Sequence, residues 1–380
     1  MDHKAQKSQF RSGDVPELTV SQFNPRRLTF ARKRRGYNKV ELAELSKVHI
    51  RSITAFEAGE FPPSPDTLER IAEAVAFPPE FFCGDDLDEP SLDTGSFRSM
   101  SKMTSRLRNM ALCQATIGLH LSNWLEARFE LPTSDLPDLS REPNPEAAAE
   151  FLRRSWLLGA LPIRNMIHLL EAKGVRVFSL SVDAREVDAF SLWKGGIPYI
   201  FLNTYKTAEH SRFDAAHELA HLVLHKEASP HGRQAEIQAN RFASSFLMPR
   251  ASVLAAPPKY PVYETLVKLK RIWAVSISAL AYRLHELAII SDWQYRGLAI
   301  EIAKHDRTKE PEGIPRETSL LLPMIFSRLY EEGFTRSKVA HALSIYASEL
   351  EQLLLGLAMT GIEGGGEPSQ QSSAKLERVK

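Results

Sequence analysis

The sequence predicts a mainly α fold of the α+β class, divided into several domains. Most of the 380 residues lie in stretches with helical hydrophobic periodicity. Short β-branched and aromatic runs suited to one small sheet lie between residues 175 and 203. Breaks rich in proline, glycine or acidic residues separate these stretches, and a chain of this length can bury two or more cores.

Composition narrows the class of protein. Hydrophobic residues make up 43% and charged residues 25% of the chain, as in ordinary globular proteins. The longest apolar runs, such as LLLPM at 320–324, are far too short to span a membrane. The N-terminus has no apolar signal region, and two cysteines make neither a disulfide framework nor a cysteine metal cluster. We therefore expect a cytoplasmic protein without a membrane partner.

The N-terminal part predicts four short helices. Residues 1–22 are polar and aperiodic, and we expect a disordered tail there. Residues 23–84 contain two helices joined by a tight turn at Ser46–Val48, which is typical of a helix-turn-helix DNA-binding domain. The expected elements are a helix over Pro25–Arg35, a second capped by Asn38, a third over His49–Ala58 that ends at Gly59, and a fourth that starts at Ser64 and Pro65.

Charge supports double-stranded operator DNA as the partner of this domain. Residues 26–39 carry seven basic residues and no acidic one, which favours phosphate contacts over a merely solvated helix face. Helix-turn-helix proteins usually read paired half-sites, so we expect a homodimer. The candidate DNA-binding residues are Arg32, Arg34, Arg35, Asn38, Lys39, His49, Arg51 and Ser52.

The run from Ala31 to Val75 resembles the XRE (Cro/C1-type) helix-turn-helix domain almost from end to end. Two positions depart from that pattern. Lys47 stands at a turn position often held by glycine, so it is expected to adopt a positive φ. His49 replaces the usual small polar cap of the recognition helix.

Residues 85–144 are expected to form a linker and a long connector helix. The acidic segment GDDLDEPSLDTG is typical of a linker, and helical periodicity follows from Phe97 to about Glu130. Arg98, Lys102 and Arg106 form a basic stripe, for which a solvated surface is favoured over DNA contact. This helix is predicted to position domains or mediate dimerisation.

Residues 145–255 hold the principal motif, after two predicted helices and the three short strands. His217, Glu218 and His221 form H-E-x-x-H within the helical run RFDAAHELAHLVLH. Residues four apart on a helix are neighbours, so both imidazoles can reach one Zn²⁺. Glu218 lies beside the ion and can act as general base. The strand over residues 197–203 is a candidate edge strand for substrate pairing, with a purely structural role as the equal alternative.

A catalytic zinc usually has three protein ligands. Glu236 opens the second apolar helical run and is the candidate third ligand. His225 is too distant, because the eight residues from His217 span roughly 12 Å along a helix. We expect His225 to support the ligands from behind or to pack in the core, and we place Asn240 among the supporting residues.

The run FDAAHELAHLVLH, followed by E-x-x-A-N-x-F-A and LMP, resembles the ImmA/IrrE family of bacterial zinc metallopeptidases. The resemblance extends from about residue 145 to 300, through IPYIFLN and VSISALAYRLHELAIIS. It implies a zincin-like domain with His217, His221 and Glu236 as zinc ligands and Glu218 as the catalytic residue. It also implies proteolytic inactivation of a repressor.

The remaining segments are predicted to be helical. Residues 256–305 resemble a helix-turn-helix-like module that commonly follows the family's peptidase core, and could bind DNA, bind a protein or buttress the site. Residues 306–360 are expected to form a C-terminal helical region, and residues 361–380 a disordered tail rich in glycine and serine.

The sequence therefore predicts a DNA-binding transcriptional regulator with a zinc-dependent endopeptidase domain that cleaves a repressor or partner protein. The alternative is a transcription factor or antitoxin whose peptidase-like half is a non-catalytic sensor or partner-binding module. A third alternative is a domain in which zinc has a purely structural role. The sequence does not distinguish zinc from manganese as the bound metal.

Overall fold

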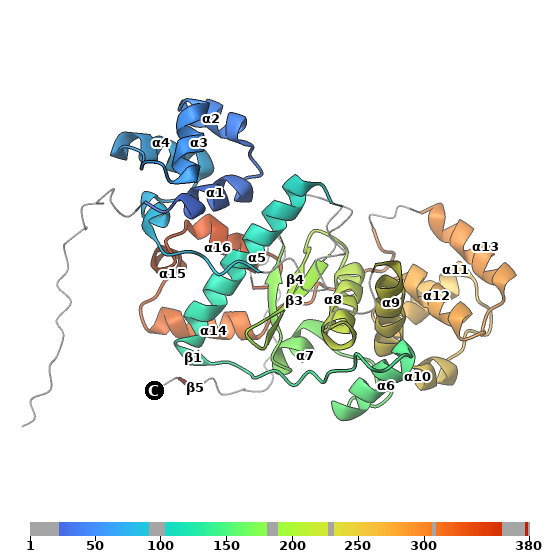
Figure 1. Ribbon diagram of the computed structural model, residues 1–380. Helices are drawn as coiled ribbons and strands as arrows, with labels where there is room; N and C mark the ends of the chain where they lie inside the picture. The colour runs from blue at the N-terminus through green and yellow to red at the C-terminus, as the bar shows by residue number, and fades with distance from the viewer. Residues whose placement is uncertain are drawn as a thin grey trace, which may run out of the picture. The chain divides into compact units, whose positions relative to one another are not determined.

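The computed structural model describes residues 23–90, 103–180, 189–226, 232–305 and 309–358, and the backbone of 377–378. The expected tails at 1–22 and 361–380, apart from 377–378, lie outside these residues, as do Arg98 and Lys102. The described residues separate into two compact units (Figure 1): those within 1–32 and 38–86, and those within 33–37 and 87–380. The described part is mainly helical with a small mixed sheet, which confirms the predicted fold class.

The first unit contains the four expected helices. Asn38 is extended and its side chain accepts hydrogen bonds from the amides of Val40 (2.8 Å) and Glu41 (2.9 Å). The Glu41 carboxylate accepts from the Asn38 amide at 2.7 Å, which completes a capping box. The elements are α1 (Pro25–Arg34), α2 (Lys39–Ser46), α3 (Ile50–Ala58), α4 (Pro65–Val75) and the 3₁₀ turn η2 (Pro79–Cys83).

Aromatic side chains fill the centre of this unit. The ring of Phe81 lies 4.4 Å from that of Phe77 and 5.8 Å from that of Phe30, centroid to centroid. All three side chains are buried. The 3₁₀ turn that follows α4 therefore returns to pack on α1 and closes the core.

Lys47 ends α2 in the left-handed conformation, with φ 54°, as its position predicts. Because a Cβ is strained there, Lys47→Gly is expected to raise the free energy of unfolding of this unit by about 0.5–1 kcal/mol. Hydrogen-exchange protection of the α2 and α3 amides in the full chain measures the change. Glu44→Gly, in the same helix, is the control and should lower that energy by about 0.5–1 kcal/mol. A loss of protection in both variants would contradict strain at Lys47.

The sheet of the second unit has the order β2–β4–β3. Strand β2 (Arg176–Ser179) runs parallel to β4 (Ile197–Leu202), and β3 (Ala189–Lys194) runs antiparallel to it. Strand β4 is therefore the central strand, paired on both sides. The prediction that residues 197–203 form an edge strand is wrong, because strand order is set by tertiary pairing and not by local composition.

Helices cover both faces of this sheet (Figure 1). On one face, α5 (Ser105–Glu126) approaches closely, since a Cβ at Gly118 would lie only 2.8 Å from Cε1 of Phe201. On the other face lies α8 (Ala208–Leu224), where the indole of Trp193 donates to the carbonyl of Leu222 at 3.0 Å. Alternate residues of the strands thus face opposite helices.

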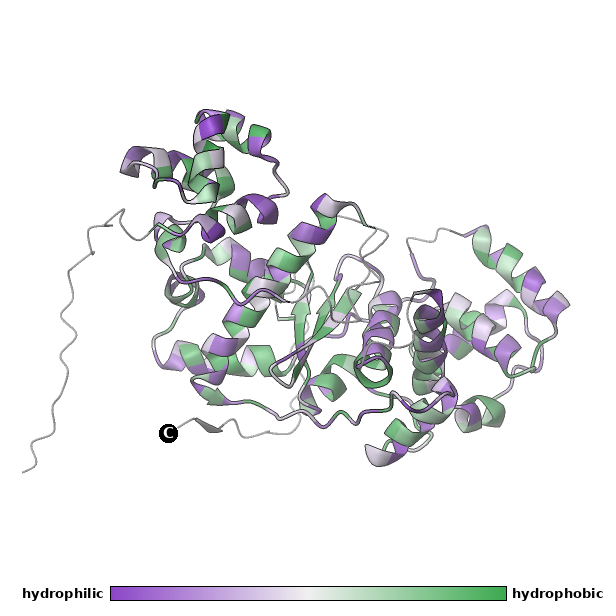
Figure 2. Cartoon of the chain, in the orientation of Figure 1, coloured by the Kyte–Doolittle hydropathy of each residue, from purple (hydrophilic) through white to green (hydrophobic). Residues whose placement is uncertain are grey.

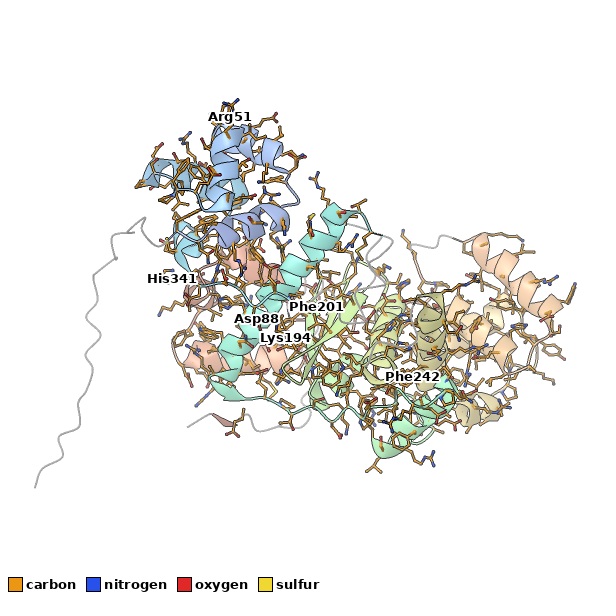
Figure 3. All side chains as sticks on the ribbon, in the orientation of Figure 1. Arg51, Asp88, Lys194, Phe201, Phe242 and His341 are labelled. Atoms are coloured by element: carbon orange, nitrogen blue, oxygen red, sulfur yellow. The ribbon has the colours of Figure 1, made fainter. Side chains whose placement is uncertain are left out.

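Helix α9 (Arg233–Leu247) packs along α8, and α6 (Pro145–Ser155) packs against α9. The rings of Phe242, labelled in Figure 3, and Phe246 stack with centroids 5.5 Å apart. Trp156 meets Phe246 edge-on at 5.9 Å. This aromatic cluster fixes α9 beside the helix that carries the H-E-x-x-H motif. Helix α7 (Met166–Ala172) precedes the sheet.

The C-terminal helices are joined to the same core. The indole of Trp273 donates to Ser252 at 3.0 Å, and buried Lys270 lies 2.9 Å from buried Glu209 of α8. The hydroxyl of Thr204 donates to the carbonyl of Leu355 at 3.0 Å. These elements are α10 (Arg250–Ala255), α11 (Tyr263–Leu269), η4 (Lys270–Ile272), α12 (Ile277–Glu286), α13 (Asp292–Ala303), α14 (Leu321–Glu331), α15 (Arg336–Ala342) and α16 (Ala347–Leu354).

Two further features complete the description. Strand β1 (Phe129–Glu130) pairs with β5 (Glu377–Arg378) in a short antiparallel ladder. Figure 2 shows hydrophobic residues concentrated on β3 and β4, whereas the helices mix hydrophobic and hydrophilic residues. Among the described helices, none has the length and apolar character needed to cross a bilayer.

Candidate metal centre

Helix α8 brings two imidazoles of the motif together. It begins after Thr207, whose hydroxyl accepts from the His210 amide at 3.3 Å. His217 and His221 then lie one turn apart on this helix, with ring centroids separated by 4.8 Å. The first turn of the neighbouring helix α9 supplies Glu236. These three side chains form a group whose possible ligand atoms all lie within 4.8 Å of one another.

The separations of the donor atoms fit one small cation. The two Nε2 atoms of His217 and His221 are 3.1 Å apart. Oxygens of Glu236 lie 3.4 Å from the first and 3.6 Å from the second. Three ligands of a tetrahedral zinc, each roughly 2.0–2.1 Å from the ion, would be about 3.3 Å from one another. The donor set and its spacing therefore fit a small tetrahedral cation such as zinc.

Residues behind the candidate ligands orient both imidazoles. Burial and the neighbouring His221 lower the pKa of His225 to about 4, so this ring is neutral near pH 7. Its Nε2 lies 3.1 Å from the amide oxygen of Gln238, which can only accept, so the proton sits on Nε2. His225 Nδ1 then accepts from Nδ1 of His221, 2.9 Å away, and leaves Nε2 of His221 with its lone pair toward Glu236.

His217 is held in the same way. Its Nδ1 lies 3.1 Å from the amide oxygen of Asn240, so it donates there and turns its Nε2 lone pair toward His221. Burial opposes a charge on His217, but the carboxylates of Glu236, Glu218 and Asp214 raise its pKa above the usual value. When His217 and His221 are protonated at Nε2, their hydrogen bonds lower the pKa of Glu236. The carboxylates around His217 thus favour a positive charge at this position.

Glu218 lies beside this group and is only 3% exposed. Its Oε2 accepts a hydrogen bond from the hydroxyl of Ser191 at 2.7 Å. Ser191 belongs to β3, the edge strand next to α8. Ser191 could not be predicted from the sequence, because a lone serine in a strand carries no local signal.

Comparison with known families matches both halves of the chain. A family model for the IrrE N-terminal-like domain of M78 peptidases matches residues 170–285. A helix-turn-helix family model matches residues 30–82. The chain joins an XRE-type helix-turn-helix domain to an IrrE-like peptidase domain. The resemblance drawn from the sequence is thereby confirmed. No curated protein matches the chain.

The IrrE-like domain also contains a largely buried titratable residue, Asp214, that no motif in the sequence indicates. Asp214 lies three residues before His217 on α8, and one of its carboxylate oxygens, Oδ2, has no partner among the described residues. Burial raises the pKa of Asp214 to about 7. Its other oxygen lies 3.4 Å from His210 Nε2. Asp214 thus adds to the negative potential that acts on His217.

Three arginines among the candidate DNA-binding residues are already paired within the chain. Arg32 makes two bonds to Glu57, at 2.6 and 3.0 Å. Arg34 and Arg35, which belong to the second unit, bond Glu349 at 2.9 and 2.6 Å. The carboxylate of Glu349 is buried. We therefore expect these guanidinium groups to stabilise the fold and not to contact phosphates.

The other candidate residues lie around the recognition helix α3 of the helix-turn-helix domain. His49 caps this helix, its Nδ1 accepting from the Arg51 amide at 3.2 Å. Arg51 is exposed (Figure 3) and Ser52 is half-buried. Lys39 lies 3.3 Å from Glu57 and keeps part of its side chain exposed. Asn38 is committed to the cap of α2 through its side-chain oxygen.

Proposed function

We propose that the IrrE-like domain is a zinc-dependent endopeptidase that cleaves a repressor or another partner protein. The helix-turn-helix domain would bring this activity to operator DNA, as part of a transcriptional regulator. The observation that carries the proposal is the tetrahedral spacing of the donor atoms of His217, His221 and Glu236. The buried carboxylate of Glu218 beside them supports hydrolysis over a structural metal site.

Each residue has a separate part in this mechanism. His217, His221 and Glu236 would hold the ion, and zinc bound there acts as a Lewis acid toward water and the scissile carbonyl. Glu218 accepts the proton of the attacking water and passes it to the leaving amine. The Ser191 hydroxyl donates to Glu218 and holds the carboxylate in place. Asn240 and His225 keep the Nε2 lone pairs of the histidines directed at the ion.

The substrate backbone would align on β3. An edge strand can extend its ladder by pairing with an extended peptide, whereas the central strand β4 cannot. Strand β3 also carries Ser191, which contacts the proposed general base. A peptide on this edge would therefore pass next to Glu218.

Peptide cleavage is tested by incubating the zinc-loaded chain with a mixture of peptides and identifying new termini by mass spectrometry. The proposal expects new termini that a zinc chelator abolishes. An unchanged mixture at all times would favour the non-catalytic sensor or partner-binding module.

For the DNA-binding domain, Arg51→Ala is expected to weaken operator binding by about 5–150-fold, because its exposed guanidinium lies at the start of the recognition helix. Fluorescence anisotropy on a DNA site selected with the wild-type chain measures the affinity. Titration with salt separates base from phosphate contacts, since loss of a phosphate contact reduces the salt slope by about one. Arg328→Ala, at an exposed position in α14, is the control and should change neither quantity. Unchanged affinity of Arg51→Ala would exclude α3 as the reading helix.

A further inference from the structure

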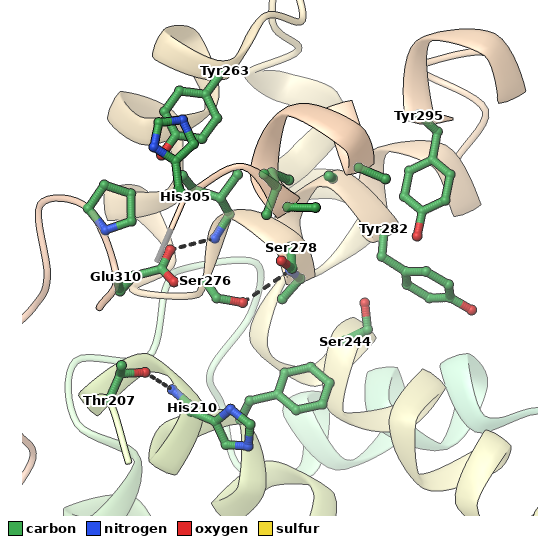
Figure 4. A pocket seen from close by; sticks show the side chains of 18 of the residues that line it. Thr207, His210, Ser244, Tyr263, Ser276, Ser278, Tyr282, Tyr295, His305 and Glu310 are labelled. Atoms are coloured by element: carbon green, nitrogen blue, oxygen red, sulfur yellow. Dashed lines mark hydrogen bonds between the residues drawn. The ribbon is translucent and has the colours of Figure 1, made fainter. Parts of the chain in front are cut away.

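A cavity of about 810 Å³ lies beside the metal centre, between α8, α9 and the C-terminal helices α11–α13 (Figure 4). Cavities that bind small ligands or substrate groups usually have volumes of about 300–1,000 Å³. All of its lining residues belong to the second unit. The catalytic mechanism described above does not use this space.

The cavity continues the groove that holds the metal ligands. Phe213 of α8 lines it and lies one turn before His217. On α9, Glu236, Asn240 and Ser244 follow one another at four-residue intervals and so share one face. Asn240 both bonds His217 and lines the cavity. A group bound in the cavity would therefore lie within about one or two helical turns of the metal ligands.

Aromatic and small apolar side chains make up much of the wall. The ring of Tyr263 stacks on that of His305, with centroids 4.3 Å apart. Tyr282 and Tyr295 line the cavity on the side away from Tyr263 and His305 (Figure 4). Helices α12 and α13 contribute alanines at positions 279, 281, 299 and 303, which leave space between the rings. Such walls favour a flat apolar group.

Among the described residues that line the cavity, each charged or titratable side chain is paired, neutral or exposed to solvent. Glu310 accepts from the Ile277 amide at 2.8 Å and lies 3.4 Å from buried Lys270. Burial lowers the pKa of His210 to about 4, so this ring is neutral. Lys309 is exposed to solvent. The described part of the wall thus presents no unpaired charge away from solvent, which favours an uncharged ligand.

One polar atom in the wall lacks a partner. Ser244 is 1% exposed, and its hydroxyl has no hydrogen-bond partner among the described residues. Figure 4 shows this hydroxyl pointing into the cavity. A buried polar group without a partner is unfavourable, so a bound group that hydrogen bonds to Ser244 would remove that cost.

We propose that the cavity binds an uncharged aromatic side chain of the polypeptide that the metal centre cleaves, close to the scissile bond. This inference rests on the proposed peptidase function, because that function makes a polypeptide substrate the source of the aromatic group. The aromatic character follows from the walls, and a polar atom on the group, as in tyrosine, would bond Ser244. The remaining volume accommodates neighbouring residues of the peptide.

Binding is tested without turnover on the zinc-loaded full chain carrying Glu218→Gln, by calorimetry with two probes. N-acetyl-L-tyrosinamide should bind at least about ten-fold more tightly than N-acetyl-L-alaninamide, because only the first buries a ring. Adding Ala299→Phe, at an exposed position of α13 that lines the cavity, should lower the affinity for the tyrosine probe by a similar factor. Ala342→Phe, exposed at the end of α15, is the matched control and should leave binding unchanged.

Ser244→Ala separates a ligand-binding role from a structural one. It should lower the affinity for the tyrosine probe by about 3–10-fold. The thermal unfolding midpoint should be unchanged or higher, because the variant removes an unpaired hydroxyl. Equal binding of the two probes, or full binding by the Ala299→Phe chain, would overturn the assignment of the cavity even if the protein cleaves peptides.

A second experiment identifies the source of the aromatic group. The zinc-loaded chain with native Glu218 is incubated with a random peptide library, and the cut sites are sequenced. Aromatic residues should be enriched at one position near the cut, and Ala299→Phe should abolish the enrichment. Cleavage without aromatic preference, together with binding of the tyrosine probe, would assign the cavity to a free aromatic molecule and overturn the proposal. Probe binding without any cleavage would support the aromatic chemistry of the cavity and contradict the peptidase function itself.

Discussion

Glu218→Gln is expected to lower kcat/KM for peptide cleavage by about 10²–10⁴-fold, the usual contribution of a general acid–base group. The amide cannot take the proton of the attacking water. It can still accept the hydrogen bond that Ser191 donates to Glu218, so the surroundings of the side chain are preserved. Steady-state kinetics on a peptide identified from the cleavage mixture measures the effect.

Zinc content must be measured on the same preparations. Glu218 is not among the three grouped donors, so the variant should bind zinc as the wild type does. Glu264→Gln, an exposed glutamate in α11, is the matched control and should keep full activity. Cleavage by Glu218→Gln at the wild-type rate would remove Glu218 from the chemistry. Unchanged regulation in cells carrying this variant would favour the non-catalytic sensor.

Glu236→Ala is expected to lower the affinity for zinc by at least about 100-fold. Loss of residues that merely orient a ligand already costs about 10–100-fold, and Glu236 would be a ligand itself. Its oxygens lie 3.4 and 3.6 Å from the two imidazole nitrogens, so no other described carboxylate replaces it in the grouped donor set. Competition with a chromophoric chelator measures the affinity.

Stability provides an independent measure of the same loss. At a free zinc concentration 100 times the dissociation constant, binding stabilises the wild type by about 2.7 kcal/mol, and this gain should largely disappear in Glu236→Ala. Asn240→Ala is an intermediate comparison, with an expected loss of affinity of about 10–100-fold. If Glu236→Ala binds zinc as tightly as the wild type, Glu236 is not the third ligand.

Local patterns predicted much of the helical framework. Three of the four helices of the first unit follow from their caps: Asn38, His49 and Ser64 each accept a backbone amide where the sequence places a helix start. The grouping of His217, His221 and Glu236 was also predictable from the sequence, because the two histidines stand four apart and Glu236 begins the next amphipathic helix. Both signals are local in sequence and depend on helical geometry.

Features that depend on contacts between residues far apart in the sequence could not be predicted. Nothing near Arg32 or Arg34 in the sequence indicates that Glu57 and Glu349 neutralise them. The order β2–β4–β3 places residues 197–202 in the centre of the sheet, although their composition equally suits an edge. Ser191 reaches Glu218 across 27 residues, and Ser244 meets the cavity only because α12 and α13 fold back over α9.

The meeting of His217, His221 and Glu236 at one zinc ion is tested most directly by X-ray absorption spectroscopy of the purified full chain, with the metal content measured on the same sample. We expect one zinc per chain, two imidazole nitrogens at about 2.0–2.1 Å and oxygen as the remaining ligands, with the imidazole signal reduced in His221→Ala. Zinc without imidazole ligands, or a spectrum that His221→Ala leaves unchanged, would contradict the proposed centre.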